Sequence, residues 1–313
     1  ADEDTLNASL ILNGGIIINL SNGNISAADI GADSMALGTI EHIVGSNQGD
    51  TLTGDAGANS IEGLDGDDIL DGGTGGADYL DGGDGDDTII VNEDSANDTY
   101  IGGDSGETGG DTLDASSITG GGLVVNLDTN VFQANAADPG AAIGTDTIDG
   151  FENVFTGDGD DIITGNAGNN TIQSGAGNDT ITAGAGDDVV IGGADNDIFY
   201  DGAGADEYNA AVGGDNTFHA VDDGEADTFT GGAGTDTLNL GALSSDIIAD
   251  LSTDTLTTGD SDEMTSIDNI TTGSGDDTVT GTAGDNVINT GDGDDLVRGG
   301  AGNDTIDLGS GGT

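Results

Sequence analysis

Hydrophobic positions recur every nine residues over much of the chain. In GDAGANSIE (54–62) and GLDGDDILD (63–71), six residues rich in glycine and acid precede three residues with an aliphatic centre. Three such residues predict a short β-strand whose central side chain points inward and whose flanking side chains point outward. The six residues before them predict a turn, because glycine allows positive φ and close approach of neighbouring backbones.

The nine-residue unit fills three blocks of the sequence. They run from GSNQGDTLT (45–53) to GGDGDDTII (82–90), from TGDGDDIIT (156–164) to GGAGTDTLN (231–239), and from TGSGDDTVT (272–280) to GGAGNDTID (299–307). One unit cannot bury its single apolar residue, whereas stacked units build a continuous core. Two nines per coil predict an all-β solenoid with two parallel sheets and with turns along both edges.

A longer period groups these blocks into three tandem modules. DTLNASLILNGGIIINLS (4–21), DTLDASSITGGGLVVNLD (111–128) and DTLNLGALSSDIIADLS (236–252) are versions of one segment, and each precedes a nonapeptide array. We expect module 1 at 1–110 (spacer 1–44, repeats 45–101), module 2 at 111–235 (spacer 111–155, repeats 156–235) and module 3 at 236–313 (spacer 236–271, repeats 272–313). The last residues, LGSGGT, break off inside a repeat, which favours a piece of something longer or a subunit that continues into a neighbour.

The charge of the chain limits the classes of molecule that it can bind. It has 62 acidic residues and one basic residue, Arg298, with a formal net charge of −61. Nucleic acid and anionic membrane surfaces would be repelled. No apolar stretch approaches the roughly 18–20 residues that span a membrane. Multivalent cations are therefore the expected partners.

The repeated acid at the sixth position of the nine indicates which cation binds. Stacking places these carboxylates in a column at strand spacing, about 4.8 Å, where they repel unless cations lie between them. Carboxylates and turn carbonyls are hard oxygen ligands that suit Ca²⁺ better than Mg²⁺. The chain has no cysteine, and His42 and His219 stand alone, so thiolate and zinc sites are not expected. We expect several Ca²⁺ ions to form part of the fold.

The units GGAGNDTID and GGAGTDTLN fit the pattern G-G-x-G-x-D-x-U-x, where U is a large apolar residue, at every defined position. The chain therefore resembles the RTX family, the hemolysin-type calcium-binding repeats, and its spacers resemble those of large secreted bacterial RTX proteins. The resemblance implies a right-handed parallel β-roll and type I secretion from a Gram-negative bacterium to the cell surface or beyond. It also implies Ca²⁺ ligands at the sixth positions, namely Asp50, Asp68, Asp78, Asp87, Asp161, Asp179, Asp188, Asp197, Asp206, Asp227, Asp236, Asp277, Asp295 and Asp304.

Two segments depart from the pattern. GLDGDDILD lacks the second glycine, and AAVGGDNTFHAV (210–221) is out of register, which argues against calcium at Asp215. Acids of the spacers, such as Asp29, Asp33 and Asp262, are interpreted as solvated surface charges.

Two further features of the arrays carry hypotheses. The second nine of each module has Asn in place of Asp, at Asn59, Asn170 and Asn286, and we interpret these as the positions where each calcium ladder begins. Aromatic residues gather between Phe199 and Phe229. Since several of them fall at the inward eighth position, a stacked core is favoured over a carbohydrate-binding platform.

Two functions fit these observations. The first is a non-catalytic extracellular structural protein, such as a matrix filament, a surface layer or an adhesin region, which stiffens with calcium and self-associates end to end. The second is the calcium-dependent secretion and folding segment of an exported enzyme or toxin. The sequence shows no HExxH, GxSxG or phosphate-loop motif, so we expect no enzyme activity within these residues.

Overall fold

The computed structural model describes residues 4–10, 14–27, 31–34, 40–210, 212–259 and 261–310. Every regular element in these residues is a β-strand, and most strands have three residues. None of the described residues belongs to a helix that is long and apolar enough to cross a membrane. The chain divides into two compact units, residues 1–159 and 160–313. The division into three modules stays a prediction.

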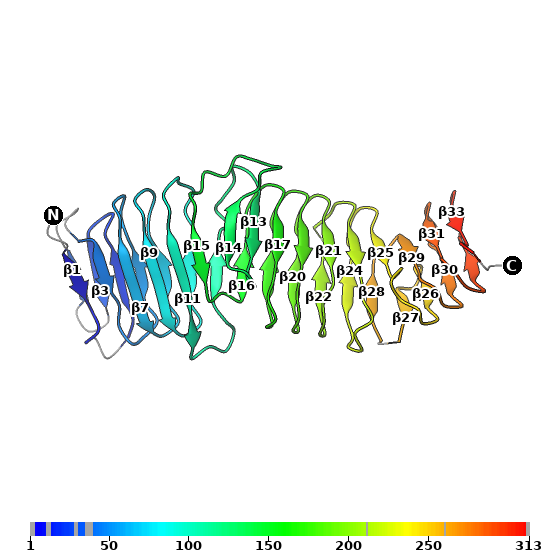
Figure 1. Ribbon diagram of the computed structural model, residues 1–313, viewed down its shortest axis with the longest axis horizontal. Coiled ribbons are helices and arrows are strands. Elements are labelled where there is room, and N and C mark those ends of the chain that lie inside the picture. The colour runs from blue at the N-terminus through cyan, green and yellow to red at the C-terminus, as the bar shows by residue number, and fades with distance from the viewer. Residues whose placement is uncertain are drawn as a thin grey trace. The chain divides into compact units, whose positions relative to one another are not determined.

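Unit 1 is built from two stacks of strands that the chain enters in turn (blue to green in Figure 1). The first stack has the order β1 (Thr5–Asn7), β5 (His42–Val44), β7 (Ser60–Asp65), β9 (Tyr79–Asp84), β11 (Thr99–Ser105), β15 (Thr147–Asp149), β14 (Val131–Ala134) and β13 (Leu123–Asn126). The second has the order β16 (Asn153–Phe155), β12 (Thr112–Asp114), β10 (Thr88–Ile90), β8 (Ile69–Asp71), β6 (Thr51–Thr53), β2 (Ile16–Asn19), β3 (Asn24–Ala27) and β4 (Gly31–Ser34).

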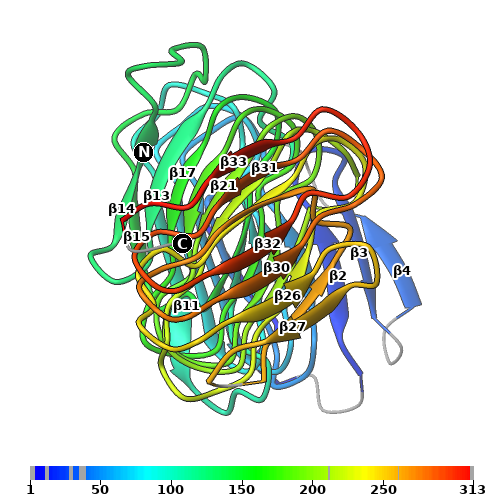
Figure 2. The same cartoon turned by 90° about the vertical axis from the view of Figure 1, so that its right-hand side faces the viewer.

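Unit 2 repeats this plan and adds a third stack near the C-terminus, which Figure 2 shows from its end (orange and red). The first stack has the order β17 (Ile162–Thr164), β19 (Thr180–Thr182), β21 (Ile198–Tyr200), β23 (Thr217–His219), β25 (Thr237–Asn239), β29 (Asn269–Thr271), β31 (Val287–Asn289) and β33 (Thr305–Asp307). The others are β28 (Glu263–Thr265), β24 (Thr228–Thr230), β22 (Glu207–Asn209), β20 (Val189–Ile191) and β18 (Thr171–Gln173), and then β27 (Thr255–Thr257), β26 (Ile248–Asp250), β30 (Thr278–Thr280) and β32 (Leu296–Arg298).

Successive strands of a repeat stack pair in parallel, one coil apart. Leu52 of β6 lies beside Leu70 of β8, which lies beside Ile89 of β10. The offset between the first two is 18 residues, the same as that of the hydrogen bond between Asp50 and Asp68. Two nines per coil and a parallel β-roll, as expected from the sequence, are thereby confirmed.

The core is the column of eighth-position side chains. Leu52, Ile61, Leu70, Leu80 and Ile89 are all fully buried between the two stacks of unit 1. Fully burying an aliphatic side chain of this size contributes about 1.5–3 kcal/mol. Because each nine supplies only one such residue, the core is narrow and depends on the stacking of many coils.

In unit 2 several of the equivalent core positions hold aromatic side chains. Phe199, Tyr208, Phe218 and Phe229 are fully buried. The rings of Phe199 and Phe218 stack with centroids 4.8 Å apart, and those of Tyr208 and Phe229 with centroids 5.4 Å apart. The prediction of a stacked aromatic core is confirmed.

The segment 210–221 is out of register with the nine-residue period of the sequence, yet it supplies a strand at the regular position in the stack. Its strand β23 pairs in parallel with β21 and β25, and Phe218 enters the core between Phe199 and Leu238. The ten residues from 210 to 219 take the place of nine, and the turn absorbs the extra residue. The sequence departs from the period without displacing the strand, because strand register is fixed by the buried face and not by the length of the turn.

The spacers contain hairpins that the nine-residue period does not predict. β2 pairs antiparallel with β3, β13 with β14, and β26 with β27. In each hairpin the first strand is the aliphatic part of the recurring spacer segment. The spacers therefore continue the sheets of their own units instead of linking separate domains.

The missing second glycine of GLDGDDILD has a structural cost. Leu64 occupies that position with a φ of 92°, while Gly83, the equivalent residue one coil later, has a φ of 112°. Left-handed backbone costs a residue with a Cβ roughly 1–2 kcal/mol. The turn therefore demands a positive φ here whichever residue is present.

Candidate calcium sites

The sixth-position aspartates lie at the end of each turn, directly before a strand. Those that the structure buries are Asp50, Asp68, Asp78, Asp87, Asp161, Asp179, Asp188, Asp197, Asp206, Asp227, Asp236 and Asp277. The other two predicted residues, Asp295 and Asp304, are half-buried and belong to the last coils of unit 2. Buried carboxylates of this number need compensation by hydrogen bonds or cations.

Hydrogen bonds join these aspartates into ladders, each carboxylate accepting from the backbone of the coil before it. The Asp50 N–H donates to Asp68 Oδ1 (2.7 Å), the Asp68 N–H to Asp87 Oδ1 (2.7 Å), and the Asp87 N–H to Asp111 Oδ1 (2.7 Å). In unit 2 the Asp188 N–H donates to Asp206 Oδ1 (2.8 Å) in the same way. One oxygen of each carboxylate is thus fixed by the fold.

The ladders also contain aspartates that the nine-residue pattern does not predict. The additional buried aspartates in equivalent positions are Asp98, Asp111, Asp146 and Asp262. Asp262 is only 3% exposed, so its interpretation as a solvated charge was wrong. Each of these residues directly precedes a strand, but the glycines expected before it are missing or displaced. An aspartate followed by a three-residue strand pattern is the signal that would have found them. Asp29 and the Asp33 side chain lie outside the described residues.

The asparagine in the second nine-residue unit of each module lies at the start of a ladder. The Asn59 N–H donates to Asp78 Oδ1 (2.8 Å), while Asn59 Oδ1 accepts from the Asp55 N–H of its own turn (2.8 Å). Asn170 and Asn286 bond in the same two ways. An amide therefore caps its own turn at the point where a ladder begins. Asparagine also occurs inside a ladder, at Asn216, next to the exposed Asp215.

The Oδ2 atoms of the ladder aspartates show whether these residues fit a calcium ion. The Oδ2 atoms of Asp68, Asp87, Asp188 and Asp197 are buried and have no hydrogen-bond partner. Leaving such a group unpaired costs about 1–3 kcal/mol, and more when it is charged. A repeated orphan oxygen of this kind indicates a ligand that the protein itself does not supply.

The first glycine of each nine completes a cradle of oxygens. A Cβ on Gly45 would lie 2.5 Å from both Asp50 Oδ2 and the Gly63 carbonyl oxygen, and a Cβ on Gly82 would lie 2.6 Å from the Gly102 carbonyl oxygen and collide with Asp87 Oδ2. A carboxylate and a carbonyl from successive coils thus converge where only glycine fits. These are the hard oxygen donors that Ca²⁺ prefers, and the residues present fit the ion.

In the first position of DGAGADEYN an aspartate replaces this glycine. Asp201, Asp206 and Asp227 each offer a carboxylate oxygen within 4.8 Å of the others. The Tyr208 hydroxyl donates to Asp206 Oδ2 at 3.2 Å. Burial raises the pKa of Asp201 to about 7 and that of Asp227 to about 8. Three carboxylates would hold a cation here more tightly than the two of an ordinary coil.

Burial is also the main influence on the other ladder carboxylates. The pKa of Asp68 rises to about 8, mainly through burial; the Asp50 N–H lowers it, and the neighbouring charges of Asp87 and Asp50 contribute to the rise. The pKa of Asp188 rises to about 7 and that of Asp197 to about 7 for the same leading cause. Without a cation, these groups hold protons near neutral pH.

This predicts opposite effects of pH with and without calcium. The folded pKa values lie above the ordinary aspartate value of about 3.9, so the metal-free fold is most stable below about pH 4 and loses stability as pH rises to about 8. Calcium needs deprotonated carboxylates, so the calcium-bound fold should weaken as pH falls from 8 to 5. Thermal unfolding followed by circular dichroism at pH 5 and pH 8, in calcium-depleted and calcium-containing buffers, measures both trends. Sedimentation is the control for aggregation near the isoelectric point. A thermal stability of the metal-free chain that rises from pH 5 to pH 8 would contradict the prediction.

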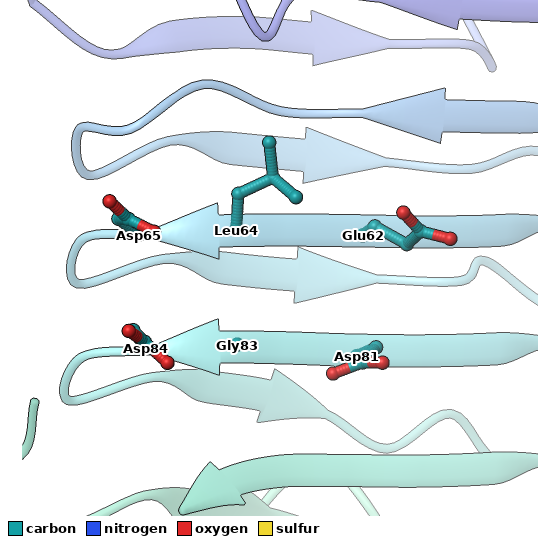
Figure 3. A pocket seen from close by; sticks show the side chains of 6 residues that line it. All are labelled: Glu62, Leu64, Asp65, Asp81, Gly83 and Asp84. Carbon is teal, nitrogen blue, oxygen red and sulfur yellow. The ribbon is translucent and has the colours of Figure 1, made fainter. Parts of the chain in front are cut away.

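Outside the ladders, a pocket of about 280 Å³ lies on the outer face of β7 and β9 (Figure 3). Its lining consists of Glu62, Leu64, Asp65, Asp81, Gly83 and Asp84. The carboxylates are exposed or half-buried and lie on successive strands. The polar side chains of this lining are all carboxylates, with no imidazole, thiol, hydroxyl or amine among them.

Of the two histidines, His219 lies on the outer face of β23. Its ring stacks on Tyr200 (centroids 4.8 Å apart) and lies 3.0 Å from Asn239 Nδ2. Burial lowers the pKa of His219, because it disfavours the charged form of the ring. These contacts give it a packing role on the sheet surface.

Comparison with known families agrees with this geometry. The RTX calcium-binding nonapeptide repeat (4 copies) matches residues 44–76, 73–95, 146–181, 155–190, 182–216, 219–243 and 271–306, which together make up more than half of the chain. No match was found among curated proteins. Asp98, Asp111 and Asp262 lie outside the matched segments, although their side chains occupy ladder positions. With its nonapeptide repeats, parallel β-roll and buried aspartate ladders, this Ca²⁺-binding chain belongs to the RTX calcium-binding nonapeptide repeat family.

Proposed function

We propose that the chain is a non-catalytic extracellular structural protein that stiffens on binding calcium and self-associates end to end. RTX repeats are typical of secreted proteins, and we propose the type I route, in which the chain folds on meeting external calcium. A matrix filament, a surface layer or an adhesin region would each use such a calcium-stiffened element.

The observation that supports self-association is the exposed core position of the last described coil of unit 2. Ile288 of β31 is fully buried, whereas Ile306, its partner one coil later in β33, is 43% exposed. The whole of β33 is exposed, and Asp304 lacks the complete burial of its ladder equivalents. Among the described residues β33 pairs only with β31, and its exposed apolar position favours the addition of another coil, from a continuation of the chain or from a second copy.

Assembly with calcium tests this proposal. We expect the purified chain to form end-to-end assemblies in millimolar Ca²⁺ and to stay monomeric in chelator, as measured by sedimentation velocity and electron microscopy. The variant Ile306→Lys should shorten the assemblies by placing a charge on the open core. Its matched control is Val287→Lys, since Val287 is also exposed (53%) but lies on the outer face of the sheet.

The alternative function, a secretion and folding segment of an exported enzyme or toxin, predicts a different outcome. Such a segment would fold with calcium and remain a monomer at all calcium concentrations. Monomers throughout, or assemblies that Ile306→Lys and Val287→Lys affect equally, would rule out the end-to-end proposal.

A further inference from the structure

One ladder of unit 1 ends on a glutamate of the spacer. It runs through Asp68, Asp87 and Asp111, and the next acceptor is Glu152, whose Oε2 accepts from the Asp111 N–H at 2.9 Å. Between residues 114 and 147 the chain leaves the coil to form the β13–β14 hairpin; it returns at β15 and then at β16. Glu152 therefore stands where a regular coil would supply its sixth-position aspartate.

A third carboxylate joins this pair. Glu107, Asp111 and Glu152 each offer an oxygen within 4.8 Å of the others. Asp111 is fully buried; its Oδ1 accepts from the Asp87 N–H, and its Oδ2 has no hydrogen-bond partner. A buried carboxylate with one oxygen that lacks a donor, close to two further carboxylates, indicates a place that a cation would fit.

The surrounding chain holds these carboxylates in place. Asn153 Nδ2 donates to the carbonyl oxygens of Gly109 (2.9 Å) and Gly110 (3.1 Å), so the residue after Glu152 fixes the loop that carries Glu107. On the other side of this loop, Asp86 accepts from the Thr108 N–H (2.7 Å). The loop is thus anchored to the preceding coil and to the spacer.

Glycines leave the space that a ligand would need. A Cβ on Gly102 would lie 2.6 Å from Asp111 Oδ2, and a Cβ on Gly110 would lie 2.9 Å from Glu152 Oε2. The backbone therefore approaches both carboxylates closely, as it does at the first glycines of the repeats. The position differs from them because none of its three acids belongs to the nonapeptide units of the sequence.

We propose that Glu107, Asp111 and Glu152 form a separate Ca²⁺ site that closes the ladder and ties the spacer to the repeat array. Three carboxylates carry more charge than the hydrogen bonds around them can balance, and an all-oxygen set suits a hard divalent cation. The ion links residue 107 to residue 152 in the folded chain and so holds together the two ends of the segment that contains the hairpin. This site does not depend on self-association.

The test removes charge from the site and keeps its hydrogen bonds. In the double variant Glu107→Gln/Glu152→Gln, an amide oxygen can still accept from the Asp111 N–H. The matched control is Glu41→Gln, since Glu41 Oε2 accepts from the Asp4 N–H (3.0 Å) in the equivalent spacer motif. Among the described residues, Glu41 belongs to no group of three carboxylates of this kind.

The readout is the number of Ca²⁺ ions bound per full-length chain, measured by equilibrium dialysis and metal analysis and confirmed by calorimetric titration. We expect the double variant to bind about one ion fewer than the wild type, and the control to bind the wild-type number. Wild-type stoichiometry in the double variant, or the same loss in the control, would overturn the proposal.

Circular dichroism in calcium shows whether the double variant folds. If it does not fold, the single variant Glu107→Gln replaces it, since this residue is half-buried on the loop. The single variant should weaken one calcium-binding step by about tenfold or more. An unchanged binding isotherm for a folded Glu107→Gln would equally overturn the site.

Discussion

Removal of calcium at pH 8, where the buried ladder carboxylates lose their protons, should convert the chain from β-structure to coil. Each ladder holds carboxylates one strand spacing apart, and two such charges about 4.8 Å apart repel by about 3–4 kcal/mol at an effective dielectric constant of 20. The formal net charge of −61 includes one positive side chain, Arg298, so the protein itself cannot neutralise the ladders. The narrow core, with one apolar residue per nine, is too small to offset this repulsion.

Calcium reverses that balance because it binds the folded chain alone. An ion present at 100 times its dissociation constant stabilises the fold by about 2.7 kcal/mol per site. Since many sites share one stack, their contributions add over neighbouring coils. Folding should therefore occur over a narrow range of calcium concentration.

Circular dichroism in excess chelator and then in millimolar Ca²⁺ measures the transition. A chelated sample brought to the same ionic strength with sodium chloride is the control, because monovalent salt screens exposed charges but barely reaches buried ones. Equal recovery of β-structure in sodium chloride would show that screening is sufficient. A chain that stayed fully β-structured in chelator would refute the role of the metal in the fold.

The regular coils could be predicted from the sequence because every local preference in them agrees. In GLDGDDILD the glycines, Asp68 and Leu70 each specify one feature, namely the turn, the ladder and the core. The structure places Asp68 and Leu70 as expected, at 1% and 0% exposure. Even Leu64, which breaks the pattern, adopts the backbone of the glycine that it replaces.

The ladder residues of the spacers could not be found in this way. Asp111 and Asp146 enter their ladders after long or irregular connections, so no fixed spacing connects them to the preceding aspartate. Their place is set by strand pairing between distant segments, such as β12 with β16 and β11 with β15. The hairpins were missed for the same reason, since their pairing is antiparallel and lies outside the nine-residue period.

Substitution of a first-position glycine should damage fold and site together. In Gly82→Ala, the new Cβ would lie 2.6 Å from the Gly102 carbonyl oxygen, 2.7 Å from Asp87 Cβ, and against Asp87 Oδ2. Crowding in a packed interior costs about 1–3 kcal/mol, and displacement of Asp87 would also remove a calcium ligand. We expect Gly82→Ala to need more calcium to fold and to unfold at lower urea concentration in saturating calcium.

A glycine that faces open space separates this effect from a general loss of glycine. In Gly284→Ala the nearest atom to the new Cβ is Thr282 Oγ1, at an ordinary distance of 3.5 Å, and the backbone has no positive φ. Restriction of the unfolded chain should leave this variant as stable as the wild type or more stable by up to about 1 kcal/mol. If both variants shift the calcium midpoint equally, glycine acts through chain flexibility, and the oxygen cradle does not explain the period of nine. If only Gly82→Ala shifts it, the first glycine is present because the ion and the next coil occupy the space of its side chain.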